Sequence, residues 1–340
     1  MKRYLLILLT ALLAGCGQPK QRLNIFIWSE YIDPKIVADF EREFNCRVVI
    51  DLYEDPDSMM AKMAAGGVSG YDIVVPSNRT LPIMVKQGLV APLRRENIPN
   101  LRNIDPQFTN SFFDPDNEFG APYHWGTTGL FARKPKGKPL DETWGLIFDP
   151  ANQPGAFLLL TDLRACIGAA LRFKGHSSNT TNREELSEAR DLLVEAKKRS
   201  LGFESSLGCK NRVLAKGAAL GMTYTGVMGT EEDPETYYFL PREGSEIWMD
   251  VLSVPAKAPH RDLAEKFINY FLEAKIAAQN AEFSRNATPN RAALEFLNPS
   301  VRTNPAIYPP PEVMRRLEFT RDLGEHNKLY DELWTQIKAK

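Results

Sequence analysis

The sequence predicts an α/β protein of two lobes with several strands crossing between them. Three observations lead to this expectation: strands and helices alternate over the first hundred residues, a second α/β region starts near Phe157, and no stretch rich in Pro, Gly or Ser separates the two. Strands separated by helices indicate a largely parallel sheet. The missing linker suits two connected lobes better than two independent domains, and 340 residues are enough for both.

The first region contains three strands, each followed by a helix. Its expected strands are residues 24–28, 47–53 and 71–75, and its expected helices are 34–44, 57–65 and 81–87. In the first helix, Ile36, Val37, Phe40 and Phe44 share one face, which is the apolar spacing of an amphipathic helix. Pro34 is acceptable there because the first helical turn has no hydrogen-bond partner for its N–H groups.

The second region repeats the alternation with a longer helix. We expect strands at 157–160, 221–224 and 247–254, and helices at 165–173, 183–199 and 263–272. The tail from 311 to 340 has apolar residues at intervals that indicate a helical segment.

The N-terminus has the order of an export signal. Lys2 and Arg3 precede an apolar run at 5–13, which is too short to span a bilayer, and small residues follow up to Cys16. The sequence Leu13-Ala14-Gly15-Cys16 resembles a bacterial lipoprotein box. That resemblance implies a signal peptide at 1–15, a lipid on Cys16, a polar tether at 16–22 and a membrane-anchored protein. An ordinary secretory signal with a chance cysteine is the alternative.

Export would place the remaining cysteines in an oxidising compartment. Cys46, Cys166 and Cys209 cannot all pair within the chain because their number is odd. Cys46 is most simply a buried thiol, and Cys166 and Cys209 are candidates for one disulfide. No Cys-x-x-Cys or His-rich spacing is present, so we expect neither a metal nor a cofactor.

Aromatic and acidic side chains follow several of the predicted strands. Ligands of open parallel sheets lie beyond the carboxyl ends of the strands. The candidate segments at these positions are Trp28-Ser29-Glu30-Tyr31, Ser77-Asn78-Arg79, Thr161-Asp162, Tyr224 and Trp248-Met249-Asp250. A pocket of this composition suits an organic cation, since aromatic faces attract ammonium groups and carboxylates neutralise them. Core packing, or a helix N-cap for Glu30 or Asp162, is the alternative.

Composition limits the other classes of function. The net charge of −1 gives no case for nucleic acid, which requires a basic surface. The four histidines are scattered, and the sequence has no Gly-x-Ser-x-Gly, His-Glu-x-x-His or phosphate-loop motif. We therefore do not expect an enzyme. A purely structural envelope lipoprotein is a further alternative, although it would not need an aromatic cleft.

Seven motifs occur in order along the chain and together resemble one family. They are Trp28 to Tyr31, Tyr71 to Ser77, Phe113 to Asn117, Pro122 to Gly126, Leu158 to Asp162, Trp248 to Asp250, and Thr288 to Asn290. After Arg22 the chain resembles the bacterial spermidine/putrescine-binding proteins of ABC transporters. This resemblance implies a monomer with the two-lobed periplasmic-binding-protein fold, which closes on a small organic amine and docks on a permease. It also implies a first lobe of 23–126 plus 250–291 and a second of 127–249 plus 292–340.

The resemblance also implies roles for particular residues. Trp28, Tyr31 and Trp248 match aromatic walls, with Ser29, Glu30 and Ser77 beside them. Asp250 and Asp162 match carboxylates that hold amines. The site departs from the family pattern at Ala165, which replaces a glutamate, and at four further positions: Arg79, Tyr224, Asn286 and Thr320.

Arg79 leaves three interpretations of the ligand open. The ligand is a polyamine and Arg79 faces solvent or pairs internally, for instance with Glu30. Alternatively, the ligand is an amine with a carboxylate that Arg79 grips through two hydrogen bonds, such as an amino acid or guanidino compound. The third interpretation is a polyamine sensor that does not take part in transport.

Overall fold

The computed structural model describes residues 21–109, 111–137, 139–226 and 233–340. The expected signal peptide, Cys16 and the tether up to residue 20 lie outside these ranges. Within the described ranges, no helix combines the length and the apolar character needed to cross a membrane.

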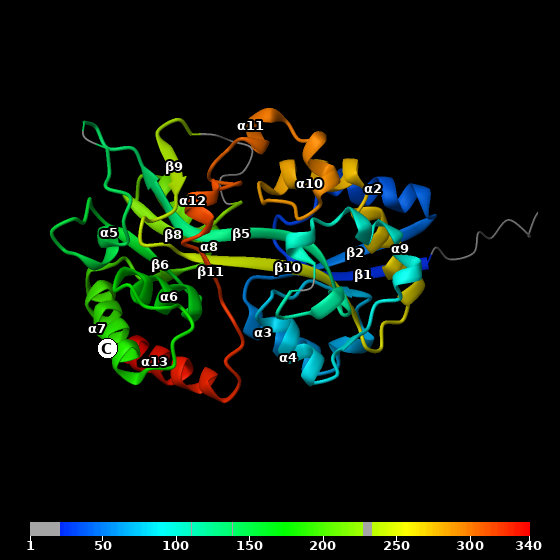
Figure 1. The fold of residues 1–340 in the computed structure, drawn as a ribbon, viewed down its shortest axis with the longest axis horizontal. Coiled ribbons are helices and arrows are strands. Elements are labelled where there is room, and N and C mark those ends of the chain that lie inside the picture. Colours follow the sequence, from blue (N-terminus) through cyan, green and yellow to red (C-terminus); the bar gives the residue numbers. More distant parts are fainter. Residues whose placement is uncertain (1–20, 110, 138, 227–232) are drawn as a thin grey trace, which may run out of the picture.

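One curved mixed sheet runs through both lobes (Figure 1). The strands are β1 (Gln21–Trp28), β2 (Cys46–Tyr53), β3 (Ile73–Val74), β4 (Val90–Ala91), β5 (Gly120–Arg133), β6 (Phe157–Leu160), β7 (Phe203–Glu204), β8 (Leu220–Tyr224), β9 (Thr236–Phe239), β10 (Glu246–Pro255) and β11 (Glu318–Phe319). Their main order is β2-β1-β3-β10-β5-β8-β6-β7, with β4 and β11 also paired to β10 and β9 to β5. As predicted, β1 pairs in parallel with β2 and β3.

Helices cover the sheet in both lobes. They are α2 (Pro34–Glu43), α3 (Pro56–Ala64), α4 (Thr80–Lys86), α5 (Gly145–Phe148), α6 (Leu163–Phe173), α7 (Arg183–Arg199), α8 (Ser206–Leu214), α9 (Arg261–Phe271), α10 (Ala274–Ser284), α11 (Pro299–Arg302), α12 (Pro311–Met314) and α13 (Asn327–Ala339). Short 3₁₀ helices connect them: η1 (Gly67–Ser69), η2 (Arg95–Asn97), η3 (Pro99–Asn103), η4 (Pro106–Phe108), η5 (Pro115–Asn117), η6 (Arg291–Glu295) and η7 (Gly324–His326).

The helices nearest the site begin at acidic caps. Asp33 accepts a hydrogen bond from the N–H of Lys35 at the start of α2, and Asp55 accepts one from Ser58 at the start of α3. Such side chains satisfy N–H groups that have no partner inside the helix. These helices follow β1 and β2, and the end of β1 carries the candidate residues Trp28 to Tyr31.

Two separate hydrophobic cores define the lobes. The first contains buried residues of β1, β3, α2 and α9, and the second contains buried residues of β6, β8, α6 and α13. Strand β5 contributes Tyr123 and Trp125 to the first core and Leu130 and Phe131 to the second, and β10 runs antiparallel beside it. These two long strands therefore join the lobes (Figure 1).

The first core extends further along the chain than the predicted lobe boundary. Ala293, Leu297, Val301 and Ile307 are buried in the first core, although residues 292–340 were expected in the second lobe. The segment packs there because η6 contacts α10, which contributes Ala277, Ala278 and Ala281 to the first core. The prediction that residues 311–340 form a helical tail is also wrong in part. Strand β11 lies within this segment and pairs with β10.

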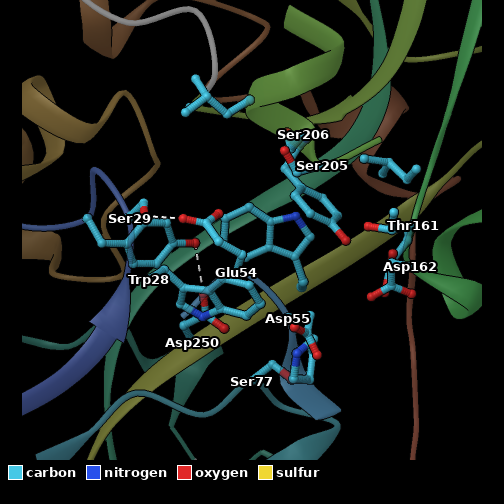
Figure 2. A pocket seen from close by; sticks show the side chains of 18 of the residues that line it. Trp28, Ser29, Glu54, Asp55, Ser77, Thr161, Asp162, Ser205, Ser206 and Asp250 are labelled. Carbon is cyan, nitrogen blue, oxygen red and sulfur yellow. Dashed lines mark hydrogen bonds between the residues drawn. The ribbon is translucent and has the colours of Figure 1, made fainter. Parts of the chain in front are cut away.

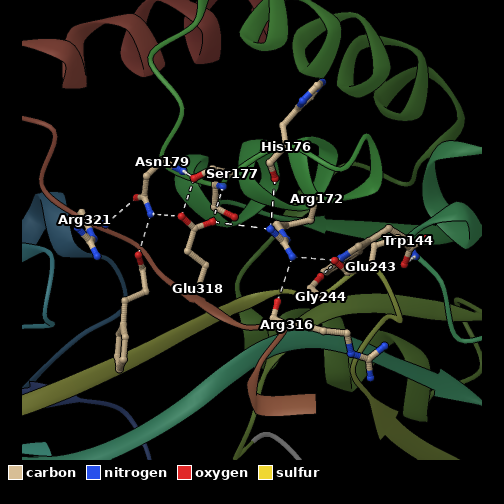
Figure 3. Close-up of polar contacts among 12 residues, drawn as sticks. Trp144, Arg172, His176, Ser177, Asn179, Glu243, Gly244, Arg316, Glu318 and Arg321 are labelled. Carbon is tan, nitrogen blue, oxygen red and sulfur yellow. Dashed lines mark hydrogen bonds and ion pairs between the residues drawn. The ribbon is translucent and has the colours of Figure 1, made fainter. Parts of the chain in front are cut away.

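A polar network holds the segment around β11 against the second lobe (Figure 3). The carboxylate of Glu318 accepts hydrogen bonds from the hydroxyl of Ser177, the N–H of Ser178 and the amide of Asn179, while the N–H of Arg321 donates to Asn179. These bonds lower the pKa of Glu318 although burial opposes them. The network fixes the third chain segment that passes between the lobes.

The expected disulfide between Cys166 and Cys209 is absent. Both are buried free thiols, and each donates to a carbonyl of β6, Cys166 to Leu160 at 3.0 Å and Cys209 to Leu159 at 3.9 Å. Burial raises the pKa of both thiols, to about 12 for Cys209. Each thiol is thus directed at the strand rather than at the other cysteine.

Candidate ligand-binding site

A cavity of about 520 Å³ lies between the lobes, and every predicted site residue except Thr320 lines it. The predicted residues that line it are Trp28, Ser29, Glu30, Tyr31, Ser77, Arg79, Asp162, Tyr224, Trp248, Asp250 and Asn286. Figure 2 shows Trp28 and Ser29 on the opposite side of the cavity from Thr161 and Asp162. Residues far apart in the sequence therefore meet at one place, as the strand-end argument expects.

The end of β1 supplies an aromatic wall. The Trp28 ring lies 4.5 Å from the Tyr53 ring and 6.4 Å from the Tyr31 ring, measured between centroids. Glu30 between them adopts a left-handed backbone with φ of 58°, which turns the chain sharply so that Tyr31 also reaches the cavity. The Glu30 side chain itself is exposed. This wall can cover an alkyl chain or an ammonium group.

Asp250 is the buried carboxylate of the cavity and comes from β10. It is 3% exposed, and the Tyr31 hydroxyl donates a 2.8 Å hydrogen bond to its Oδ2 (Figure 2). Burial raises the pKa of Asp250 to about 8; the Tyr31 hydrogen bond lowers it in part, and the charge of Glu246 raises it. A carboxylate in this setting gains from a cationic partner, because a cation would offset the lost hydration.

Glu246 is a second acid of the cavity and sequence reasoning missed it. The hydroxyl of Thr128 donates to its Oε2 at 2.9 Å, and the hydroxyl of Thr320 donates to its Oε1. Burial raises the pKa of Glu246, the charge of Asp162 raises it further, and both hydroxyls and Arg79 lower it. The alternation Glu246, Trp248, Asp250 along a strand could have identified it, since alternate residues share a face.

Thr320 lies outside the cavity and hydrogen-bonds to one of its acidic residues. It was predicted to contact the ligand, but it is buried and does not line the cavity. Its hydroxyl is instead occupied with Glu246, so it positions that carboxylate.

Arg79 faces the cavity and pairs with Asp162. Its Nη2 lies 3.6 Å from Oδ2 of Asp162, and both side chains are about one-fifth exposed, at 22% and 20%. Two sequence-based suggestions for Arg79 are therefore wrong: it pairs with Asp162 rather than with Glu30, and it lines the cavity instead of facing solvent. Burial would lower the pKa of Arg79, but the charges of Asp162 and Glu246 outweigh it and raise the pKa. Asp162 also caps α6 by accepting from the N–H groups of Arg164 and Ala165.

The loop that carries Arg79 is tied firmly to β10. The buried Asn78 donates its N–H to the carbonyl of Met249 at 2.7 Å, and its side-chain oxygen accepts from the N–H of Met249 at 3.0 Å. Its side-chain amide also donates to the carbonyl of Thr320 at 2.7 Å. The backbone next to Arg79 is consequently held in place against β10.

Tyr224 and Trp248 complete the aromatic lining of the cavity. The rings of Tyr224 and Trp248 meet edge to face with centroids 6.1 Å apart. Asn286 is buried and also lines the cavity, and its side-chain oxygen has no hydrogen-bond partner among the described residues. That oxygen is available as an acceptor for a donor group of a ligand.

Several further polar residues line the cavity without having been predicted. They are Glu54, Asp55, Asp57, Ser205 and Ser206, whereas Asn78 and Thr161 belong to the candidate segments and also line the cavity. The hydroxyl of Ser29 donates to Glu54, which follows β2 directly (Figure 2). The strand-end rule, applied to the strand ending at Tyr53, would have found Glu54 and Asp55. In the described ranges, no three acidic, His or Cys side chains gather as metal ligands would.

Comparisons with known proteins agree with this geometry. The family model for bacterial extracellular solute-binding proteins matches residues 35–309. The spermidine/putrescine-binding periplasmic protein of Escherichia coli is 31% identical over 329 residues, which covers 96% of this chain and 94% of that protein. The putrescine/cadaverine-binding protein of Pseudomonas aeruginosa is 30% identical over 352 residues, which covers 98% and 99%.

A solved structure has the same fold. The spermidine/putrescine ABC transporter substrate-binding protein of Streptococcus pneumoniae superimposes with a TM-score of 0.81 at 30% identity. The match covers 94% of this chain and 99% of that one.

Proposed function

Because the chain belongs to the bacterial extracellular solute-binding proteins, we propose that it binds a polyamine such as spermidine or putrescine and delivers it to an ABC permease. The relatives that cover nearly the whole chain are named for binding these amines. The observation that carries the proposal is Asp250, a buried carboxylate held by Tyr31 within an aromatic cavity.

The binding step follows from charge and desolvation. An ammonium group placed against Asp250 would supply the positive charge that the empty cavity lacks at that point, so the carboxylate would ionise. The rings of Trp28 and Trp248 would cover the methylene chain and attract the cationic ends. A ligand held by both lobes favours the closed arrangement to the extent that it contacts both better there.

Arg79 bears on the alternative ligand, an amine that also carries a carboxylate. Its guanidinium is already engaged with Asp162, so a ligand carboxylate would have to compete with that pair. Acidic side chains predominate around the cavity. Both features favour an amine without a carboxylate, and the proposal includes no catalytic step.

The proposal extends to location and assembly. The N-terminal pattern supports a protein anchored outside the cytoplasm by a lipid on Cys16. We propose that the anchored protein acts as a monomer, in which one cavity between two lobes forms the whole site.

Calorimetric titration of the purified chain without its first 20 residues tests the proposal. Putrescine, cadaverine and spermidine form the test panel, and γ-aminobutyrate and glutamate serve as matched ligands that carry a carboxylate. Saturable binding of at least one polyamine at one site per chain is expected, with weaker or no binding of the amino acids. Tight binding of an amino acid with none of the three polyamines would overturn the proposal.

A further inference from the structure

Three residues of β10 line up in the cavity as acid, indole, acid. Glu246, Trp248 and Asp250 line the cavity, whereas Ile247 and Met249 do not, as the alternation of a strand requires. The two carboxylates are four residues apart, so their Cα atoms are separated by roughly 13 Å at the usual rise of a strand. A linear molecule lying along β10 would have a carboxylate near each end and an indole beside its middle.

The inner part of the cavity has a definite charge. Among the described residues that line it, the charged side chains that are not exposed are Asp162, Glu246, Asp250 and Arg79. The other acids that line it, Glu30, Glu54, Asp55 and Asp57, are exposed, and so is the cation Lys338. Solvent screens exposed charges much more than buried ones. Three inner carboxylates and one guanidinium leave a formal charge of −2 when all are ionised.

Arg79 already neutralises one of the three carboxylates. It forms an ion pair with Asp162, and the adjacent Asn78 fixes its backbone on β10. Glu246 is held differently, by the hydroxyls of Thr128 and Thr320, and hydroxyl groups orient a carboxylate without cancelling its charge. Glu246 and Asp250 thus remain as the two inner acids without an ion-pair partner at 4.0 Å or less among the described residues.

We propose that Arg79 is a specificity-determining residue, a built-in cation that occupies Asp162 and leaves Glu246 and Asp250 as the two ammonium sites of an α,ω-diamine. This inference rests on the proposed function and narrows its ligand class. A diamine such as putrescine or cadaverine matches the charge of −2. A triamine such as spermidine brings a third ammonium that meets the guanidinium of Arg79, and like charges brought together across an interface discriminate strongly against a ligand.

The test compares putrescine, cadaverine and spermidine by calorimetry in the wild type and four variants. The wild type should bind the better diamine at least about tenfold more tightly than spermidine. Arg79→Gln frees Asp162 and should shift the diamine-to-spermidine affinity ratio by about tenfold or more toward spermidine. Arg315→Gln removes the same charge from an exposed position outside the cavity and should leave the ratio unchanged.

A charge cycle isolates the role of Glu246. Glu246→Gln should weaken diamine binding by about tenfold or more, because one ammonium site loses its charge. The double variant Arg79→Gln/Glu246→Gln restores the inner charge to −2 and should recover part of that loss through the freed Asp162. Circular dichroism and melting curves identify any variant that fails to fold, and the wild-type ratio tests the inference without any substitution.

The outcomes separate this inference from the proposed function. If the wild type binds none of the three amines, the proposed function itself fails. If it binds spermidine as tightly as the diamines, or if Arg79→Gln folds and leaves the ratio unchanged, the inference fails and polyamine binding stands. A wild-type preference for a diamine that Arg79→Gln shifts and Arg315→Gln does not supports the inference.

Discussion

The hydroxyl of Tyr31 donates a 2.8 Å hydrogen bond to Oδ2 of Asp250, across 219 positions of sequence. One partner follows β1 in the first lobe, and the other lies in β10, which passes between the lobes. The bond keeps the carboxylate oriented toward the cavity while burial opposes its ionisation. Asp250 therefore favours a cationic ligand, and it lowers the stability of the ligand-free protein.

Replacing Asp250 by Asn should weaken amine binding and stabilise the empty protein. The loss of a charge-assisted contact is expected to cost about 1.5–3 kcal/mol of binding free energy. The unfolding free energy of the ligand-free variant at pH 8 should exceed that of the wild type, because no carboxylate has to be buried. Calorimetry and urea unfolding measure the two quantities, and equal affinity in the variant would contradict the role of Asp250.

The wild type should respond to pH in two opposite ways. The pKa of Asp250 is raised from 3.8 to about 8 by burial, so between these values the unfolded chain is ionised there and the empty folded protein is not. The unfolding free energy of the empty protein should therefore fall as pH rises from about 4 to about 8. Amine affinity should rise over the upper part of this interval, with release of a proton on binding.

Titrations in buffers of different ionisation enthalpy measure that proton. The pH dependence of the unfolding free energy should be smaller in Asp250→Asn. This variant lacks the carboxyl group with the raised pKa, while Glu246 still contributes. A wild-type affinity that stays constant between pH 6 and 8 would argue against a protonated Asp250 in the empty site.

Trp28→Leu should weaken the binding of every polyamine. The indole face is lost while an apolar side chain remains, and a desolvated contact between an ammonium group and an aromatic face contributes about 0.5–2 kcal/mol. Phe112→Leu is a matched control, because Phe112 is exposed and lies outside the cavity. Equal affinities of the two variants would show that the wall at Trp28 does not contact the ligand.

Glu318→Gln should destabilise the protein at neutral pH and make it less sensitive to acid. Hydrogen bonds lower the pKa of Glu318 against the effect of burial, so its stabilising contribution is present above the ordinary value of 4.5 and is lost as pH falls through the lowered pKa. The variant should lose about 1–3 kcal/mol of unfolding free energy at pH 7. Glu325→Gln, which alters an exposed acid nearby, should unfold like the wild type.

The sequence predicted the elements of the first lobe and most site residues, but it did not predict the longest strand. β5 has the sequence Gly-Ala-Pro-Tyr-His-Trp-Gly-Thr-Thr-Gly-Leu-Phe-Ala-Arg, which looks unlike a strand because of its glycines and proline. The structure explains two of the glycines. A Cβ at Gly126 would lie 2.4 Å from the Trp248 ring, and one at Gly129 would lie 2.5 Å from the carbonyl oxygen of Phe239.

The remaining errors have a common cause. Arg79 pairs with Asp162 and Thr320 with Glu246, and in each case the partner comes from a different part of the chain. Local spacing shows which residues share a face of one element, but it does not give the distances between elements. The disulfide expectation failed in the same way, because belonging to one lobe does not bring two thiols together.

Asn78 joins the loop after β3, strand β10 and the chain just after β11 through one buried amide. These three segments come from the first lobe, the crossing strand and the return of the chain toward α13 (Figure 1). A rotation of one lobe against the other that keeps these bonds has its pivot near this amide. In such a rotation displacement grows with distance from Asn78, so reporter groups on the outer rims of the lobes would register it, and groups close to the pivot would not.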